Sequence, residues 1–447
     1  MSFITDKQTL DDLNITGKYK GDSVFSLFDH THTRGGARLL EAMFQQPLSD
    51  ATAINDRSSI FRYFQSKEVV FPVSKETCEA VELYMSGAGT SGMAGTAGMI
   101  FRKRLLRDIG SDKEYDVIHT GIVSLIEFIN VLNDFFAQLD PDENVLPYQQ
   151  AVQEVKQLFN TAGLNSVLLA RGITKLSLWK VIKYDHLLRC THQQEIKRVM
   201  QILYETDVYI TVSRIAAANK FVYARAIPFM EGRNGIEMVN VFHPQLAGAI
   251  ANSVLTNHNH NLIFLTGANM AGKSTFMKSF GIAVYLAHMG FPVAAERMTF
   301  SVQDGLYTSI NVADNLSMGY SHFYAEVLRV KQVAEAVSQS KNLVIIFDEL
   351  FKGTNVKDAY DATVAVTEAF AENRNCTFII STHIVEAGQT LQDRCANMDF
   401  VYFPTIMNNG VPRYTYKLQE GISNDRHGMM IITNEGIVDI IKGRVEA

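Results

Sequence analysis

The chain has 447 residues, of which 47% are hydrophobic and 20% charged, and its net charge is −6. This is an ordinary globular balance that can bury a full core, and the length allows about two to four domains. The negative charge excludes a generally basic surface, so any contact with nucleic acid has to come from a local patch.

Targeting and redox signals are sparse. No stretch of about 18 uncharged apolar residues is present, and the N-terminal segment MSFITDKQTLDD lacks the basic-then-apolar pattern of a secretion signal. Cys78, Cys190, Cys376 and Cys395 are too far apart for a metal knuckle and are interpreted as reduced thiols. We therefore expect no membrane span and a cytoplasmic protein.

The first half of the chain has helical periodicity. Ser86–Met99 is rich in glycine and small residues, and the sequence does not decide between a loop and a closely packed helix. Helices are predicted over Tyr115–Gln138, which ends before an Asp-Pro pair, and over Val152–Phe159. One long amphipathic helix is predicted over Glu195–Ala226, where apolar residues recur at three- and four-residue steps.

The pattern changes near Pro228–Gly235. Beyond it, the short apolar runs NLIFLTG, NLVIIFDE and CTFIISTH alternate with helical segments. Such runs are typical of strands buried on both faces, as in a parallel sheet covered by helices. We therefore predict a helical part over residues 1–232 and an α/β part over residues 233–447.

The segment GANMAGKS, Gly267–Ser274, fits the pattern G-x-x-x-x-G-K-[ST]. Glycines let the backbone curl so that successive N–H groups face an anion, and the following helix adds the positive end of its dipole. Lys273 supplies a charge for the β- and γ-phosphates, and Ser274 can coordinate Mg²⁺. A glycine turn without a ligand is the alternative, and the predicted strand before and helix after the segment argue against it.

Two acids end the next apolar run, LVIIFDE. Asp348 would hold Mg²⁺ directly or through water, and Glu349 would orient or polarise the attacking water. His383 ends the run TFIISTH and could reach the γ-phosphate, although a single histidine is more often structural. These residues predict the hydrolysis of a nucleoside triphosphate.

These motifs resemble those of the MutS mismatch-repair ATPases, a branch of the ABC-type ATPases. TGANMAGKSTFM, ADNLSMGYSHFYAEV, DELFKGTNVKD and STHIVE are similar to the family's nucleotide motifs, in the same order. HGMMIITNEGIVDIIK is similar to its C-terminal pairing segment. SVFSLFDHTHTRGGARLLEAMFQQPLSDATAINDR and LYETDVYITVSRIA resemble the start of its helical core and its lever helix. The resemblance covers both ends of the helical half and nearly all of the α/β half.

The resemblance implies an α/β P-loop ATPase domain of the ABC/MutS type, preceded by an all-α core and lever domain. It also implies a homodimer that holds ATP and Mg²⁺ at the seam between two ATPase domains. Ser321 of the second copy would cap the γ-phosphate near Asn269, although a serine before a helix is also a common N-cap. Asp314 and Asp358 either orient loops across the seam or are solvated. The residues implied in nucleotide binding are Gly267, Ala268, Asn269, Met270, Ala271, Gly272, Lys273, Ser274, Thr275, Ile250 and Ser321.

Several positions depart from the family pattern. Ala268 stands where proline is usual, and Ala271 stands where glycine is usual, so a methyl group constrains the loop. The aromatic residue that commonly stacks on adenine aligns with Ala249, so adenine would pack on Ile250 or other apolar groups. We also expect no mismatch-reading or connector domain before the core, and a reduced or absent clamp between Arg107 and Glu195.

One segment of the helical half offers basic side chains to DNA. The segment FRKRLLRD offers Arg102, Lys103, Arg104 and Arg107 to DNA phosphates, but a solvated helix face is the slightly favoured interpretation. We expect a DNA-binding ATPase, acting on double-stranded or branched DNA in mismatch repair or recombination. An ATP-driven switch that binds a protein instead is the alternative. A structural protein with a degenerate nucleotide site is a third, which the intact site residues argue against.

Overall fold

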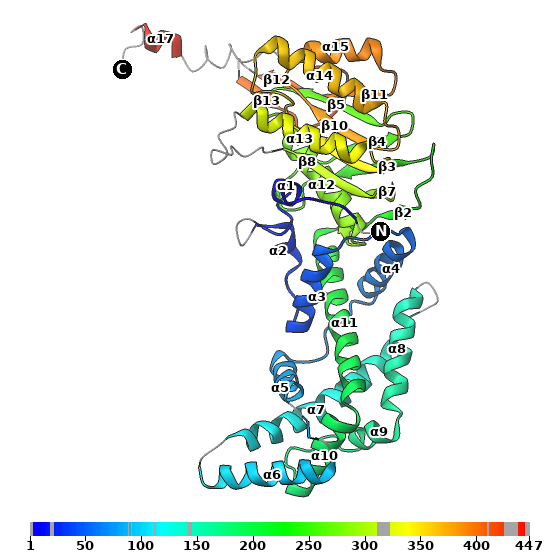
Figure 1. The fold of residues 1–447 in the computed structure, drawn as a ribbon, viewed down its shortest axis with the longest axis vertical. Coiled ribbons are helices and arrows are strands. Elements are labelled where there is room, and N and C mark those ends of the chain that lie inside the picture. The colour runs from blue at the N-terminus through cyan, green and yellow to red at the C-terminus, as the bar shows by residue number, and fades with distance from the viewer. Residues whose placement is uncertain are drawn as a thin grey trace. The chain divides into compact units, whose positions relative to one another are not determined.

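The computed structural model describes residues 3–17, 22–87, 89–90, 92–110, 113–141, 145–310, 322–408, 411–423 and 437–442. The chain divides into two compact units, one mainly helical and one α/β (Figure 1). The helical unit contains Phe28–Met43 and Ser59–Ile215, and the α/β unit contains Met1–Leu27, Phe44–Ser58 and Ala216–Ala447.

These units do not follow the expected division at residues 232 and 233, because N-terminal segments pack into the α/β unit. The side-chain amide of Asn55 donates to the carbonyl of Ala226 and accepts from its N–H, at 2.9 and 3.0 Å. The backbone N–H of Leu48 likewise donates to the carbonyl of His288 at 2.7 Å. Whether residues 1–232 and 233–447 form separate domains stays a prediction.

The helices of the helical unit confirm most of the predicted periodicity. α7 lies within one residue of the prediction, α8 begins earlier than predicted, and α11 ends before the expected Ala226. The glycine-rich segment is part loop and part helix, since α6 begins at Met93 after Gly92, whose φ is +86°. The elements wholly or partly in this unit are α3 (Arg34–Gln45), α4 (Ala51–Lys67), α5 (Lys75–Ser86), α6 (Met93–Asp108), α7 (Glu114–Gln138), α8 (Leu146–Phe159), α9 (Ala162–Leu168), α10 (Leu178–His186), the π-helical turn Leu187–Thr191 and α11 (Gln193–Asn219).

A buried carboxylate on α11 fixes the start of α3. Asp207 is fully buried and accepts from the N–H and the hydroxyl of Thr33, both at 2.8 Å. A side chain at Gly36 would meet this carboxylate, because a Cβ there would lie 2.6 Å from Oδ2 of Asp207. The glycines of the segment TRGGAR are thus required by close packing against α11.

α7 is the described helix that most resembles a membrane-spanning segment. Among the described residues, this helix alone is long and apolar enough to cross a membrane by length and composition. Of its most apolar window, 56% is buried inside the protein, which is the property of a core helix. It is therefore weak support for a membrane span.

The α/β unit is built on a six-stranded sheet of order β14-β11-β5-β10-β9-β8, parallel except at β14 (Figure 1). Every residue of β5, β9 and β10 is buried, as the apolar runs predicted. The strands are β5 (Leu262–Gly267), β8 (Gly305–Ser309), β9 (Leu343–Phe347), β10 (Thr377–Ser381), β11 (Met398–Phe403) and β14 (Gln419–Glu420).

Helices cover both faces of this sheet. Residues of α13 (His322–Val337), α14 (Val356–Ala371) and α15 (Val385–Arg394) form one core with Phe264, Phe347 and Phe378. α12 (Lys273–His288) packs on the opposite face, where a Cβ at Gly281 would lie 3.2 Å from the side chain of Ile346. Neighbouring strand residues point to opposite faces of a sheet. Ile346 therefore packs against α12, and Phe347 packs against the layer of α13, α14 and α15.

A second, four-stranded sheet of order β2-β7-β3-β4 completes the unit with smaller elements. Its strands are β2 (Arg225–Ile227), β3 (Gly235–Val241), β4 (Asn252–Asn257) and β7 (Arg297–Ser301). The remaining elements are α1 (Lys7–Asp12), α2 (Val24–Phe28), β1 (Val222–Tyr223), β6 (Pro292–Val293), β12 (Thr405–Asn408), β13 (Val411–Tyr414) and α17 (Ile437–Ile441).

A buried histidine makes the stability of the α/β unit depend on pH. His288 is fully buried, its Nδ1 donates to the carbonyl of Val284 at 2.8 Å, and its Nε2 accepts from the N–H of Gln303 at 3.0 Å. Burial lowers the pKa of His288 from 6.5 to about 4. The neutral ring is thus the form that the folded protein keeps.

Lowering the pH from 6.5 towards 4 should therefore destabilise the protein, because His288 binds a proton in the unfolded state but stays neutral in the folded state. The free energy of unfolding should fall by up to about 1.4 kcal/mol per pH unit from this group. Urea unfolding at pH 7, 6 and 5 measures the slope, and a His288→Gln variant should show a smaller one. Equal slopes in the two proteins would contradict this assignment.

Candidate functional site

The predicted site residues gather at the carboxyl edge of the six-stranded sheet. β5 lies between β11 and β10, and its last residue, Gly267, opens the loop that leads into α12. Asp348 follows β9, and His383 comes shortly after β10. Because these strands are parallel, their carboxyl ends meet at one edge, which is where α/β sheets bind ligands.

The loop between β5 and α12 is curled as the glycine pattern requires. Gly267 and Gly272 have φ angles of +138° and +110°, and Met270 has +68°. Only glycine adopts the first two without strain. Ala271 is fully buried, so the methyl group that replaces the usual glycine packs into the protein.

Lys273 is buried beneath this loop. Its Nζ donates to the carbonyls of Gly267 and Ala268, at 2.9 and 3.2 Å. Burial lowers the pKa of the Lys273 ammonium, and the carboxylates of Asp348 and Glu349 oppose that effect. The Lys273 ammonium is thus held at the loop by two neutral backbone carbonyls and by attraction to two nearby carboxylates.

Two hydroxyl groups hold the Asp348 carboxylate. Ser274 donates to Oδ2 at 2.6 Å, and Ser381 donates to Oδ1 at 2.5 Å. The backbone N–H of Asp348 donates to the carbonyl of Ser309 at 2.9 Å. The Ser274 hydroxyl and the carboxylate are oxygen donors of the kind that Mg²⁺ prefers.

The described residues contain no group of three or more His, Cys, Asp or Glu side chains that could hold a metal ion. Mg²⁺ beside a nucleotide commonly takes one or two protein oxygens and completes its shell with phosphate and water. The pair formed by Ser274 and Asp348 fits that kind of site and does not fit a metal cage made by the protein alone.

Glu349 and His383 face each other. Nε2 of His383 is hydrogen-bonded to Oε1 of Glu349, and Nζ of Lys352 lies 3.8 Å from Oε2. The hydrogen bond from His383 holds the pKa of the Glu349 carboxyl below its usual value, although burial acts in the opposite direction. Glu349 has a φ of +57°, and its N–H donates to the carbonyl of Ser381 at 3.0 Å. The two residues thus form one hydrogen-bonded pair at the sheet edge.

A cavity of about 310 Å³ adjoins the loop, and its lining includes Gly272, Thr275, Ala249 and Ile250. The ring of Tyr416 also lines it and lies against Gly272, where a Cβ would come within 3.1 Å of the ring. Tyr416 is a candidate site residue that the sequence reasoning missed. It follows β13, far from the loop in sequence, and no motif marks it.

The side chains of Asn252 and Lys417 hold the segment around Tyr416 in place. Nδ2 of Asn252 donates to the carbonyl of Tyr416 at 3.0 Å, and the N–H of Leu418 donates to Oδ1 of Asn252 at 2.7 Å. Nζ of Lys417 donates to the carbonyl of Ala251 at 2.6 Å. The segment that follows β13 is thus bound to the start of β4, beside Ile250.

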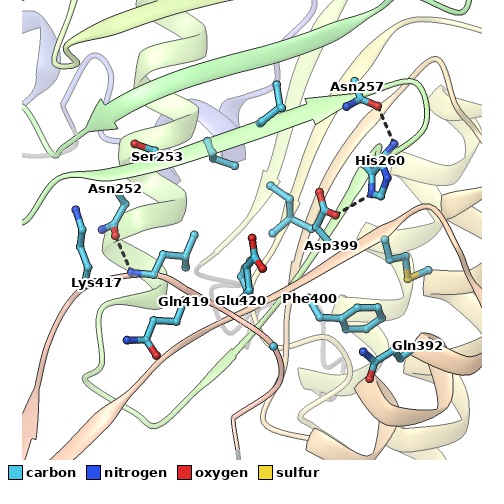
Figure 2. A pocket seen from close by; sticks show the side chains of 17 residues that line it. Asn252, Ser253, Asn257, His260, Gln392, Asp399, Phe400, Lys417, Gln419 and Glu420 are labelled. Carbon is cyan, nitrogen blue, oxygen red and sulfur yellow. Dashed lines mark hydrogen bonds and ion pairs between the residues drawn. The ribbon is translucent and has the colours of Figure 1, made fainter.

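A larger cavity of about 800 Å³ lies elsewhere, between β4 and the strands β11 and β14 (Figure 2). His260 and Asp399 are hydrogen-bonded in it, with 2.8 Å between Nδ1 and Oδ1. None of its lining residues comes from the loop between β5 and α12. Size alone therefore does not select the candidate nucleotide site.

Other predicted residues fall outside this cluster. Ser321 and Asp314 lie outside the described residues. Asp358 lies in the first turn of α14, where its N–H donates to Oδ1 of Asn355 at 2.9 Å and its carboxylate accepts from the Asn355 amide at 2.5 Å. Its side chain is therefore bonded to the cap of its own helix.

The basic cluster on α6 is largely neutralised. Lys103 pairs with Glu114 at 2.5 Å, and Arg107 pairs with Asp108 and Asp116 at 2.8 and 3.2 Å. Arg104 lies 4.0 Å from the same Asp108. These pairs favour a solvated, internally balanced helix face over a DNA-binding patch.

Two family models match the chain in order along the sequence. MutS domain III matches residues 8–86, and MutS domain V matches residues 263–444, which contain the whole cluster from the loop to His383. The chain is also similar to two proteins named DNA mismatch repair protein MutS. The one from Leuconostoc mesenteroides is 25% identical over 98% of this chain, and the one from Streptococcus pyogenes is 27% identical over 55%.

The chain belongs to the MutS family. The family resemblance read from the motifs is therefore confirmed. The MutS relatives are longer, since the chain spans 61% of the Leuconostoc protein and the match covers 29% of the Streptococcus protein.

Proposed function

We propose that this MutS-family chain is a Mg²⁺-dependent ATPase that hydrolyses ATP to ADP and phosphate. The observation that carries this proposal is the grouping of Lys273, the Ser274–Asp348 pair and the Glu349–His383 pair at one sheet edge. Phosphate contacts, metal ligands and a base are the parts that phosphoryl transfer requires.

The loop and Lys273 would bind the phosphates. Successive backbone N–H groups at the start of α12 face the anion, and the helix dipole adds to their field. The Lys273 ammonium would exchange its two loop carbonyls for phosphate oxygens, which are stronger partners for a charged donor. Ser274 and Asp348 would hold Mg²⁺, which neutralises charge on the phosphates when bound.

Glu349 would orient the attacking water. Its lowered pKa keeps the carboxylate ionised near neutral pH, so it can accept a hydrogen bond from water. The imidazole ring of His383 is hydrogen-bonded to Glu349, and the same ring would contact the γ-phosphate. In this arrangement His383 also fixes the direction of the Glu349 side chain.

The 310 Å³ cavity would receive adenine. Tyr416 supplies the aromatic face that is missing at Ala249, and Ile250 supplies an apolar contact. The expectation that the base packs on apolar groups alone is thereby revised in this proposal. Stacking on a ring tolerates any base, so this contact would not select adenine over other bases.

The family membership supports a homodimer with nucleotide at the seam, in which Ser321 of the second copy caps the γ-phosphate. The model for MutS domain V reaches residue 444 and so includes the proposed pairing segment. Dimer formation in the presence of Mg²⁺ and ATP, measured by light scattering, tests this part directly.

We further propose a role in DNA mismatch repair or recombination, on double-stranded or branched DNA. The matches are to MutS domains III and V, so we do not assign mismatch reading to these residues. The neutralised α6 cluster favours the second candidate, an ATP-driven switch that binds a protein.

A low-salt binding series separates the DNA-binding ATPase from the protein-binding switch. It uses matched, mismatched, branched and single-stranded DNA, with and without ATP. Absence of any DNA shift would favour the switch.

Replacing Glu349 with glutamine should leave ATP binding intact and lower turnover by roughly 10²-fold or more, because the amide cannot accept a proton from water. Lys273→Ala should instead abolish nucleotide binding. Phosphate release and binding of a fluorescent nucleotide measure the two effects. Glu372→Gln, at an exposed carboxylate that follows α14, is the matched control. Unchanged turnover in Glu349→Gln would remove the water-orienting role.

Replacing Tyr416 with alanine should weaken ATP binding by roughly 5- to 150-fold, since stacking contributes about 1–3 kcal/mol per base. Tyr416→Phe keeps the ring and should bind nearly as well as the unaltered protein. Equilibrium titration with ATP measures the difference. Inorganic triphosphate has no base, so its binding should be the same in all three proteins. Equal ATP affinity in the alanine variant would refute the stacking contact.

A further inference from the structure

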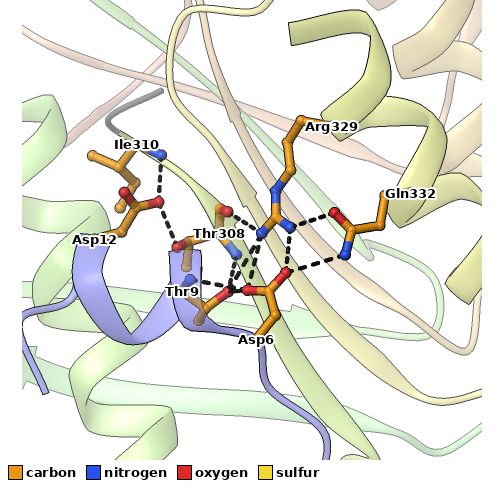
Figure 3. Close-up of polar contacts among 7 residues, drawn as sticks. All are labelled: Asp6, Thr9, Asp12, Thr308, Ile310, Arg329 and Gln332. Atoms are coloured by element: carbon orange, nitrogen blue, oxygen red, sulfur yellow. Dashed lines mark hydrogen bonds and ion pairs between the residues drawn. The ribbon is translucent and has the colours of Figure 1, made fainter. Parts of the chain in front are cut away.

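The N-terminal helix α1 is bound to the ATPase-like core by a network of buried polar groups (Figure 3). Asp6 caps the helix, since its Oδ1 accepts from the N–H of Thr9 at 2.9 Å. The same carboxylate pairs with the guanidinium of Arg329 on α13, whose side chain is only 5% exposed. Gln332, one turn further along α13, accepts from Arg329 at 3.0 Å. One short helix is thus tied to the helix that covers the sheet.

Side chains of the same helix form hydrogen bonds with residues at the carboxyl end of β8. The N–H of Thr308 donates to the hydroxyl of Thr9 at 3.0 Å, and the hydroxyl of Thr308 donates to Oδ2 of Asp12 at 2.7 Å. The N–H of Ile310 donates to that same oxygen at 2.8 Å. Nη2 of Arg329 donates to the carbonyl of Thr308 at 2.5 Å. Figure 3 shows these bonds converging on Thr308 and Ile310, at the carboxyl end of β8.

Between the two residues held in this way lies Ser309, which contacts the candidate metal site. Its carbonyl accepts from the backbone N–H of Asp348 at 2.9 Å. The Asp348 carboxylate in turn accepts from Ser274 and Ser381. Asp12 is therefore linked to Asp348 by hydrogen bonds at each end and by the backbone of Thr308–Ile310 between them.

Burial makes this path stiff. Asp12 is 4% exposed and Thr9 is fully buried, so neither can exchange its protein partners for water. Removing one member of a buried hydrogen-bonded charge leaves its partners unpaired, and this is more unfavourable than losing one exposed contact. The end of β8 has therefore one strongly preferred position, which α1 sets.

We infer that α1 is a positioning element of the proposed ATPase site, in which Asp12 fixes the end of β8 and thereby the placement of Asp348 for Mg²⁺. This inference rests on the proposed function. It makes Asp12 a positioning residue, because it touches neither metal nor nucleotide and acts through Thr308, Ile310 and Ser309.

The test compares Asp12→Ala, Asp12→Asn and Thr308→Val with the unaltered chain, and uses Asp11→Ala as the matched control. Asp11 is the neighbouring carboxylate on the same helix, but it is exposed. Asn keeps the shape and one acceptor oxygen, so it should partly restore what alanine removes. Thr308→Val removes only the hydroxyl, which keeps the test informative should Asp12→Ala fail to fold.

The first readout is metal binding, measured as free Mn²⁺ by electron paramagnetic resonance with a non-hydrolysable ATP analogue. Asp12→Ala should weaken Mn²⁺ binding about tenfold, the lower end of the range for residues that orient metal ligands. The Mg²⁺ concentration for half-maximal turnover should rise by the same factor. Nucleotide binding without metal should be unchanged, because the loop and Lys273 are untouched.

The second readout is hydrogen exchange at the backbone N–H of Asp348, which needs no activity. Exchange should be faster in Asp12→Ala and Thr308→Val than in Asp11→Ala. A folded Asp12→Ala protein with the metal binding and exchange of the control overturns the inference. A chain without turnover in its unaltered form, yet with faster exchange in the variants, overturns the proposed function and not the positioning role.

Discussion

The carboxylate of Asp348 is the point on which the candidate site depends. Its two oxygens accept from Ser274 at the start of α12 and from Ser381 at the end of β10, while its backbone is bonded to Ser309 at the end of β8. One residue thus joins three strands and a helix. Asp348 is only partly buried, so these two hydroxyl groups mainly fix the orientation of its carboxylate. The parallel sheet supplies them because it brings the strand ends to one edge.

How far this could be predicted follows from distance along the chain. The loop, the strand before it and the helix after it lie in one contiguous segment, and Asp348, Glu349 and His383 each end an apolar run, so local pattern was sufficient. Tyr416 and the α1 network could not be predicted, because each is defined by a contact between distant segments. The predicted long helix, which extended to Ala226, was too long for a related reason. Residues up to Ala226 fit a helix by periodicity, but α11 ends at Asn219 and the following residues pair with β6 and β7. Tertiary pairing prevailed over local periodicity there.

The compact units and the family models divide the chain differently, and the α1 network explains why. The match to MutS domain III starts at residue 8, within α1, yet α1 bonds to β8 and α13 of the α/β unit. The chain changes unit at residues 27–28, 43–44, 58–59 and 215–216. Met1–Leu27 and Phe44–Ser58 therefore belong to the α/β unit, although they precede most of the helical unit in the sequence.

The cavity that we propose for the base adjoins the loop between β5 and α12 at Gly272. Tyr416 holds its ring against Gly272, and Gly272 has a φ of +110° that a larger residue would adopt only with strain. Glycine at this position therefore serves two purposes, since it lets the loop curl and leaves space for the ring. In the proposed function, Tyr416, whose φ is +54°, would replace the aromatic residue that is missing at Ala249. Tyr416 is 44% exposed, so a base could stack on its ring while the loop binds the phosphates independently.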